Sequence, residues 1–205
     1  MLATERRAEI EAKVRAACNA ARLHDAATLA IESYGPEILG YLVAVTRSES
    51  DASEAFAMFS EDLWRGLEKF RWESSLRTWS YTVARNAMHR MMRDPHRRAD
   101  RRVPLSQSPE AQNVVLRVRT QTLPYLRTEV KDRVAELRRE LDPEDQTLFI
   151  LRLNRKMSWN EIASIVGGDR VLDEAERKRE AARLRKRFER AKEILRDKAR
   201  ERGLT

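Results

Sequence analysis

Residues 51–93 read DASEAFAMFSEDLWRGLEKFRWESSLRTWSYTVARNAMHRMMR, and they predict two helices joined by an aromatic loop. The first half repeats apolar side chains at helical spacing, with acids and hydroxyls between them: Ala52, Phe56, Phe59, Leu63 and Leu67. This spacing is typical of an amphipathic helix. The second half passes from an aromatic, charged segment into a helix that ends in arginines. A protein core has no need of that second combination, whereas a surface that grips and opens nucleic acid does.

Composition favours a helical protein with an anionic partner. The chain has 205 residues, enough for one domain or two small ones. Charged residues make up 36% of it, with few glycines and prolines, which is more typical of helices than of a sandwich or barrel. A net charge of +8 and an isoelectric point near 10.0 point to nucleic acid as the leading partner. Basic charge is also common on solvated helical surfaces.

Several function classes are not expected. A single cysteine, Cys18, excludes an intramolecular disulfide and a cysteine-rich zinc site, and the reducing cytoplasm is the expected compartment. No apolar run approaches membrane-spanning length, and the first residues lack the apolar core of a signal peptide. The three histidines have no metal-ligand spacing, and no glycine-rich phosphate loop is present. We therefore expect no enzyme activity, no cofactor, no metal and no membrane partner.

The residues before 51 predict further helices, and those after 93 predict a linker. Residues 5–21 are an alanine-rich helical candidate to which the sequence assigns no function. Residues 28–34 and 36–46 predict two helices separated by Gly35, with Pro36 at a first helical position. From about residue 97 to 128 the pattern weakens. This polar stretch predicts a linker with at most a short helix, because three prolines interrupt it: Pro104, Pro109 and Pro124.

The last third predicts a helix-turn-helix. After an amphipathic segment at 130–141, Asp142-Pro143-Glu144-Asp145 is a helix start, and Ser158-Trp159-Asn160-Glu161 is a capping box that opens a short helix. Gly167-Gly168 ends that helix, and a long basic helix runs from about residue 173 to 200. In a helix-turn-helix the second helix lies in the major groove of DNA. The long donors on this candidate recognition helix are Arg183, Arg185, Lys186, Arg187 and Arg190. The alternative is a charged helix balanced by its own glutamates.

The sequence therefore predicts an all-α protein of two small helical bundles joined by a flexible linker, the second bundle a helix-turn-helix. The expected boundaries are a helical extension over 1–25, a first bundle over 26–99, a linker over 100–128 and a second bundle over 129–205.

The first bundle offers a second candidate contact with nucleic acid. Unpaired bases are held by aromatic faces inside a basic groove. The aromatic candidates are Phe70, Trp72, Trp79 and Tyr81, and the basic ones are Arg77, Arg85, Arg90, Arg93, Arg97 and Arg98. Asn86 follows Arg85 and presents both a donor and an acceptor, as a reader of base edges needs. The alternative is that aromatics at helical spacing are packing residues, which is the expected role of Trp79.

FRWESSLRTWSYTVARNAMHRMMRDPHRR resembles region 2 of the extracytoplasmic-function sigma factors of bacterial RNA polymerase, and DASEAFAMFSEDLW resembles the helix before it. LDPEDQTLFILRLNRKMSWNEIASIVGG resembles region 4, the helix-turn-helix that reads the minus-thirty-five promoter element. The resemblance covers about residues 28–98 and 130–202, in the family's order. It implies an alternative sigma factor that directs RNA polymerase to specific promoters and helps to open them.

The resemblance also implies roles for residues and partners. Asn86 falls at the position of the family's reader of a flipped minus-ten base, and residues 70–81 match the loop that engages the displaced strand. The implied minus-ten set is Asn86, Arg85, Arg77, Trp72, Tyr81 and Arg90. The docking helix for the polymerase β′ clamp helices carries Glu54, Met58, Glu61 and Asp62. The implied partners are the polymerase core, including its β subunit, and promoter DNA.

Two segments depart from the family pattern. Ser53 and Ala57-Met58 stand where the docking helix usually carries polar or acidic residues. One hypothesis is that phosphorylation of Ser60 or Ser53 by a serine/threonine kinase, rather than release from an anti-sigma factor, switches docking. The alternative is apolar docking. In the second bundle, GGDRVLDEAERKREAA precedes LRKRFERA, the stretch that resembles the family's recognition helix. Either that helix begins early or the turn holds an insertion.

Two other functions stay open on the sequence. A helix-turn-helix repressor or activator would bind DNA through the second bundle, and it would not account for the aromatic loop. A helical adaptor that binds an acidic protein would need no preference among DNA sequences.

Overall fold

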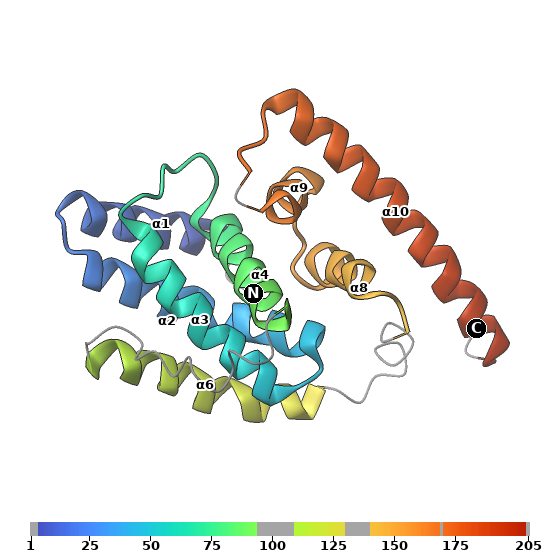
Figure 1. Ribbon diagram of the computed structural model, residues 1–205, viewed down its shortest axis with the longest axis horizontal. Helices are drawn as coiled ribbons and strands as arrows, with labels where there is room; N and C mark the ends of the chain where they lie inside the picture. The colour runs from blue at the N-terminus through green and yellow to red at the C-terminus, as the bar shows by residue number, and fades with distance from the viewer. Residues whose placement is uncertain (1–3, 94–108, 130–139, 169, 204–205) are drawn as a thin grey trace. The chain divides into compact units, whose positions relative to one another are not determined.

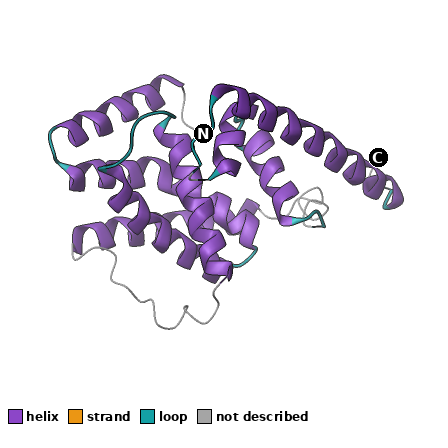
Figure 2. Cartoon of the chain, turned by 45° about the horizontal axis from the view of Figure 1, so that its top comes forward, coloured by secondary structure: helices purple, strands orange, loops and turns teal. Residues whose placement is uncertain are grey.

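The computed structural model describes residues 4–93, 109–129, 140–168 and 170–203 (Figure 1). Every regular element within these ranges is a helix, which confirms the predicted all-α class (Figure 2). The chain forms two compact units, Met1–Pro124 and Tyr125–Thr205, called unit 1 and unit 2 below. The polar segment at 100–108, most of the amphipathic helix expected at 130–141, and Arg97 and Arg98 lie outside the described residues.

Unit 1 is built around a long central helix. Its elements are α1 (Thr4–Asn19), α2 (Leu23–Thr46), α3 (Glu49–Leu67), α4 (Leu76–Arg93) and α6 (Pro109–Glu129). Helix α2 packs against α1, α3 and α4, and α3 packs against α4. The predicted stripe of α3, from Ala52 to Leu67, is at most 1% exposed. Ser48 starts that helix, because its side chain accepts a hydrogen bond from the Asp51 backbone N–H at 3.1 Å. The spacing of apolar residues in the sequence was therefore sufficient to place α3.

Helix α2 corrects one prediction. The expected break at Gly35-Pro36 does not occur, and a single helix of 24 residues runs through both. Gly35 is instead a point of close packing, since a Cβ there would lie 3.1 Å from Val118 Cγ1 and 3.2 Å from Phe56 Cζ. The lack of a side chain lets helices α3 and α6 approach α2, so this glycine serves tertiary contact rather than a turn.

Helix α6 corrects the prediction of a linker from about residue 97 to 128. Residues 109–129 form a helix of 21 residues where the sequence predicts a linker with at most a short helix. Pro109 is its first residue, where a missing N–H costs little. Val114, Val115 and Val118 are buried, and Arg117 pairs with Glu32 of α2. Much of the predicted linker is therefore packed on unit 1.

Unit 2 contains α8 (Pro143–Phe149), the π-helix η1 (Ile150–Asn154), α9 (Trp159–Gly167) and α10 (Glu174–Glu201). Asp142 caps α8 by accepting from the backbone N–H groups of Glu144 and Asp145, at 2.9 and 3.0 Å. The predicted capping box at Ser158 and Glu161 is present at the start of α9. The core joins all four elements through apolar side chains: Leu148, Phe149, Leu151, Ile162, Ile165, Leu184 and Phe188.

Helix α10 begins well before Leu184, where the stretch that resembles the family's recognition helix starts. A capping box formed by Asp173 and Glu176 starts it at Glu174, ten residues before Leu184. The segment that departs from the family pattern is thus mostly the first turns of a 28-residue helix, which agrees with the first of the two alternatives.

Candidate nucleic-acid interface

Phe70 and Trp72 of the loop between α3 and α4 form an aromatic cluster with Trp79 of α4. Phe70 stacks on Trp79, with ring centroids 4.6 Å apart and 19° between the ring planes, and Phe70 lies 4.8 Å from Trp72. Trp79 also packs on the end of α3, where a Cβ on Gly66 would lie 2.8 Å from Trp79 Cζ2. All three rings are half-buried. Trp79 therefore has the packing role expected of it, and it supports Phe70, which in turn contacts Trp72.

A stripe along α4 continues from this cluster. Trp79, Val83, Asn86 and Arg90 follow one another at intervals of four, three and four residues, so they share one face of the helix. Asn86 and Arg85 are half-buried and Arg90 is exposed. The opposite face is core, with Leu76, Ala84 and Met88 buried. The structure therefore brings the predicted base reader and one predicted arginine to the same face as the aromatic cluster.

Two predicted contacts for DNA lie inside unit 1 instead. Arg77 is 3% exposed and Tyr81 is 1% exposed. Arg77 donates from Nε to Glu37 Oε1 at 3.0 Å and pairs with the same carboxylate through Nη2, and the Tyr81 hydroxyl donates to that oxygen at 3.0 Å. A buried charge is stable only when it is paired and hydrogen-bonded. The assignment of Arg77 and Tyr81 to the DNA surface is therefore corrected: they hold α4 to α2.

The predicted docking residues lie along α3 and are half-buried: Glu54, Met58, Glu61 and Asp62. Glu61 pairs with Arg65 at 2.5 Å, one turn along the same helix. Asp62 pairs with Arg90 of α4. The structure thus joins a residue predicted to dock on polymerase to a residue predicted to contact DNA, which links the two candidate surfaces.

The two serines considered as phosphorylation sites are buried. Ser60 is 1% exposed and its hydroxyl donates to the Phe56 backbone carbonyl at 2.8 Å, while Ser53 is 7% exposed. Both residues are buried in this structure, and a kinase needs an accessible hydroxyl. The sequence did not reveal this because both serines sit next to acidic residues on a helix with a wide buried face.

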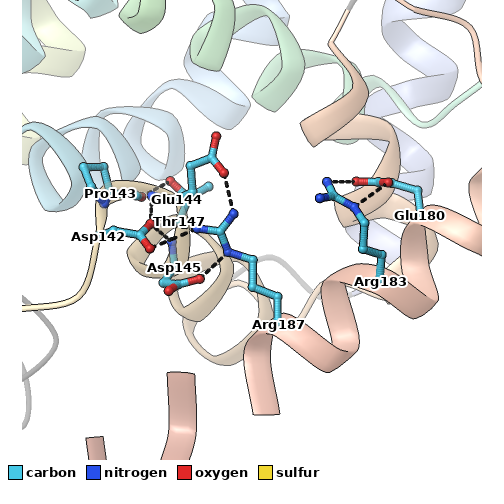
Figure 3. A network of polar contacts seen from close by, with 8 residues as sticks. All are labelled: Asp142, Pro143, Glu144, Asp145, Thr147, Glu180, Arg183 and Arg187. Atoms are coloured by element: carbon cyan, nitrogen blue, oxygen red, sulfur yellow. Dashed lines mark hydrogen bonds and ion pairs between the residues drawn. The ribbon is translucent and has the colours of Figure 1, made fainter. Parts of the chain in front are cut away.

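In unit 2, Arg187 is held at the start of α8 (Figure 3). Its guanidinium contacts three carboxylates, with Nη2 2.9 Å from Asp142, Nη1 2.6 Å from Glu144 and Nε 2.5 Å from Asp145. Burial acts to lower the pKa of Arg187, but the hydrogen bond that it donates to Asp145 and the three negative charges raise it overall. Burial dominates at Asp145 and raises the pKa of its carboxyl. Arg187 therefore ties α10 to α8 in this structure, and its assignment as a DNA contact stays a prediction.

Replacing Arg187 by alanine is expected to destabilise unit 2 by about 1–3 kcal/mol, because three acids then crowd the start of α8 without a cation. The matched control is Arg190→Ala, which removes the same charge from an exposed position on α10. Amide hydrogen exchange across α8 measures the difference. Equal exchange in the two variants would mean that the carboxylate contacts contribute nothing.

The other predicted donors of α10 are exposed: Arg183, Arg185, Lys186 and Arg190. Arg183 contacts Glu180 of the previous turn at 2.6 Å, as the charge-balanced alternative expects. Sequence reasoning missed Arg179, which is exposed and precedes Arg183, Lys186 and Arg190 by four, seven and eleven residues. The signal that marks it is the Asp173–Glu176 capping box, because the amino-terminal turns of a recognition helix reach the base edges.

Two further findings concern other classes of function. None of the helices in the described ranges is both long and apolar enough to cross a membrane. Among the same residues, no three histidine, cysteine, aspartate or glutamate side chains gather as metal ligands.

Comparison with known proteins identifies the family. The family described as Sigma-70 region 2 matches residues 30–99, which hold the aromatic loop and the α4 stripe. The RNA polymerase sigma factor YlaC of Bacillus subtilis (strain 168) is 31% identical to the chain over 137 residues, which are 65% of this chain and 75% of YlaC. No solved structure gives a significant match. The chain is a member of the sigma-70 family, of the extracytoplasmic-function type.

Proposed function

We propose that the chain is an alternative sigma factor that directs bacterial RNA polymerase to a subset of promoters and assists their opening in the cytoplasm. Membership of the family supports the general role. The observation that carries the finer assignment is the α4 stripe, where Asn86 and Arg90 share a face with Trp79 and its stacked neighbour Phe70. Stacking faces beside hydrogen-bonding and cationic groups are what an unpaired strand requires.

In this proposal unit 1 binds the minus-ten element. The aromatic loop receives unpaired bases, Asn86 reads a base edge, and Arg85 and Arg90 lie near the phosphates. Arg77 and Tyr81 take no direct part, because they are committed to Glu37 in the interior. Helix α3 docks on the β′ clamp helices of the polymerase core through the face that carries Glu54, Met58 and Glu61.

Docking then depends on apolar contact from Ala57 and Met58 together with the remaining acids. Burial of Ser60 and Ser53 does not favour a phosphorylation switch, so the proposal includes no kinase. Control by an anti-sigma factor is compatible with the same surface, which such a partner would cover.

Unit 2 binds the minus-thirty-five element through α10. The exposed donors Arg179, Arg183, Lys186 and Arg190 lie along one stripe, on a face that the core of unit 2 does not use. Arginine and lysine on such a stripe suit guanine edges and phosphates. Phosphate contacts predict that affinity falls steeply as salt rises, for specific and non-specific DNA alike.

The deciding experiment is run-off transcription with purified core polymerase and a promoter library, with and without the chain. A sigma factor produces transcripts from a defined subset only when the chain is present. A repressor or activator would bind DNA without core polymerase and start no transcript from it. A helical adaptor would retain an acidic protein and select no DNA sequence.

Replacing Asn86 by alanine is expected to reduce run-off transcription from a cognate promoter at least about fivefold, because one base-edge contact contributes about 1–3 kcal/mol of discrimination. Asn113→Ala is the matched control, since Asn113 is an exposed asparagine of α6 in the same unit. Thermal unfolding of both variants is expected to match the unmodified protein. Normal transcription with Asn86→Ala would remove Asn86 from the minus-ten site.

A further inference from the structure

Helix α1 packs on unit 1 with a face that mixes apolar and charged side chains. Ile10, Val14 and Ala17 are buried against the rest of the unit, and α1 contacts α2. Glu11 lies on the same side of the helix and is half-buried. An acid in this position is unexpected for a helix that only covers a core, because burying a carboxylate is costly unless donors meet it.

The donors that meet Glu11 come from the start of α4. The backbone N–H groups of Leu76 and Arg77 face its carboxylate and act to lower the pKa of Glu11. Ser75 accepts from the next donor, the Thr78 backbone N–H, at 3.0 Å. The first turn of a helix leaves such N–H groups without partners inside the helix. Burial has the larger effect and raises the pKa of Glu11 overall, against the effect of these two N–H groups. Glu11 therefore helps to fix where the loop ends and α4 begins.

One turn further along α1, Arg15 reaches the loop itself. Its guanidinium carbon lies 5.4 Å from the centroid of the Trp72 ring, within the range of a cation–π contact. Trp72 has a backbone φ of 60°, in the left-handed region that costs a bulky residue on the order of 1–3 kcal/mol. Such a conformation persists only where the surroundings impose it. Arg15 and the Phe70 ring are two of the contacts on this side chain.

We propose that α1 is a brace for the loop at residues 68–75, and that Glu11 and Arg15 are positioning residues for promoter opening. Glu11 fixes the end of the loop at α4. Arg15 holds the Trp72 ring in place and so stabilises the left-handed backbone conformation of that residue. Figure 1 shows this loop beside α1. The loop then meets unpaired DNA already ordered, so less conformational entropy is lost on binding. This inference rests on the proposed role of the loop in binding the opened strand.

The first test measures the brace without polymerase or DNA. Amide hydrogen exchange of the whole chain is followed by mass spectrometry for Arg15→Ala, Glu11→Gln and the control Lys13→Ala. Lys13 is an exposed cation on α1 that pairs along its own helix, with Glu9 at 2.5 Å. Exchange across residues 68–78 is expected to rise several-fold in the first two variants and to stay unchanged in the control. Unchanged exchange in Arg15→Ala and Glu11→Gln would overturn the brace.

The second test measures what the brace does. Holoenzyme with Arg15→Ala is expected to form open complexes at least fivefold more slowly on a duplex promoter, with unchanged affinity for core polymerase. In a Trp72→Ala background, Arg15→Ala is expected to cause less than a twofold further change, because it acts through that ring. Arg15→Lys keeps a cation and is expected to restore part of the rate.

The outcomes separate this inference from the proposed function. If unmodified holoenzyme opens no promoter, the proposed function fails, and hydrogen exchange still reports on the brace. If unmodified holoenzyme opens promoters and Arg15→Ala opens them equally fast, the positioning role is overturned. A faster rate in Arg15→Ala would also overturn it, since it would show that Arg15 obstructs the loop.

Discussion

Replacing Glu37 by glutamine is expected to lower the free energy of unfolding of unit 1 by about 3–5 kcal/mol, because it leaves Arg77 as an uncompensated buried charge. Arg77 is 3% exposed, and both it and Tyr81 donate to the Glu37 carboxylate. The matched control is Glu32→Gln, on the same helix, whose partner Arg117 is 54% exposed. Exposed ion pairs contribute about 0–1 kcal/mol, so this variant is expected to stay near the unmodified protein.

Urea unfolding followed by tryptophan fluorescence measures both variants. Trp64, Trp72 and Trp79 lie in unit 1, so a Trp159→Phe background confines the signal to that unit. The midpoint is expected to fall in Glu37→Gln with little change in slope. If Glu37→Gln and Glu32→Gln unfold alike, the buried network is not what joins α4 to α2, and Arg77 returns to the candidates for DNA contact.

Replacing Ser60 by glutamate is expected to destabilise unit 1 by about 4 kcal/mol or more, since it forces a charge and three further heavy atoms into a packed interior. Ser60 is 1% exposed. Ser60→Ala is expected to cost less than about 1.5 kcal/mol, because it removes only the hydroxyl that donates to the Phe56 carbonyl. The matched control is Ser50→Glu, an exposed position in the first turn of the same helix, where negative charge is favourable.

The same unfolding measurement applies, together with affinity for core polymerase. If Ser60→Glu folds like the unmodified protein and binds core polymerase more tightly than Ser60→Ala, a phosphorylation switch at Ser60 regains support. Loss of folding in Ser60→Glu alone, with Ser50→Glu unaffected, agrees with a serine that serves packing.

The sequence predicted well those features that depend on residues close together along the chain. The apolar spacing of α3 and the caps at Asp142 and Ser158 depend on residues within a few positions of one another, and the structure confirms each. The predicted start of the basic helix near residue 173 is also confirmed, and the Asp173–Glu176 capping box, which was not recognised in the sequence, accounts for it.

What the sequence could not predict depended on partners far along the chain. Arg77 and Arg187 have the residue type of a DNA contact, but their acids lie 40 or more residues away, at Glu37 and around Asp142. Gly35 has the residue type of a break, but Val118 of α6 accounts for it. The sequence assigned no function to the alanine-rich helix α1, because the contact of Arg15 with Trp72 has no local pattern.

The length of α10 has a consequence for which of its cations can contact bases and which can contact only phosphates. From Arg179 to Arg190 the helix rises about 16 Å, at about 1.5 Å per residue, whereas the major groove is about 12 Å wide. In the proposed binding of α10 in the major groove, a straight helix of that length would leave the floor of the groove before its last donor. Loss of a cation near the start of α10 should therefore change which promoters are preferred, while loss of one near the end should weaken attachment to every duplex by the same factor.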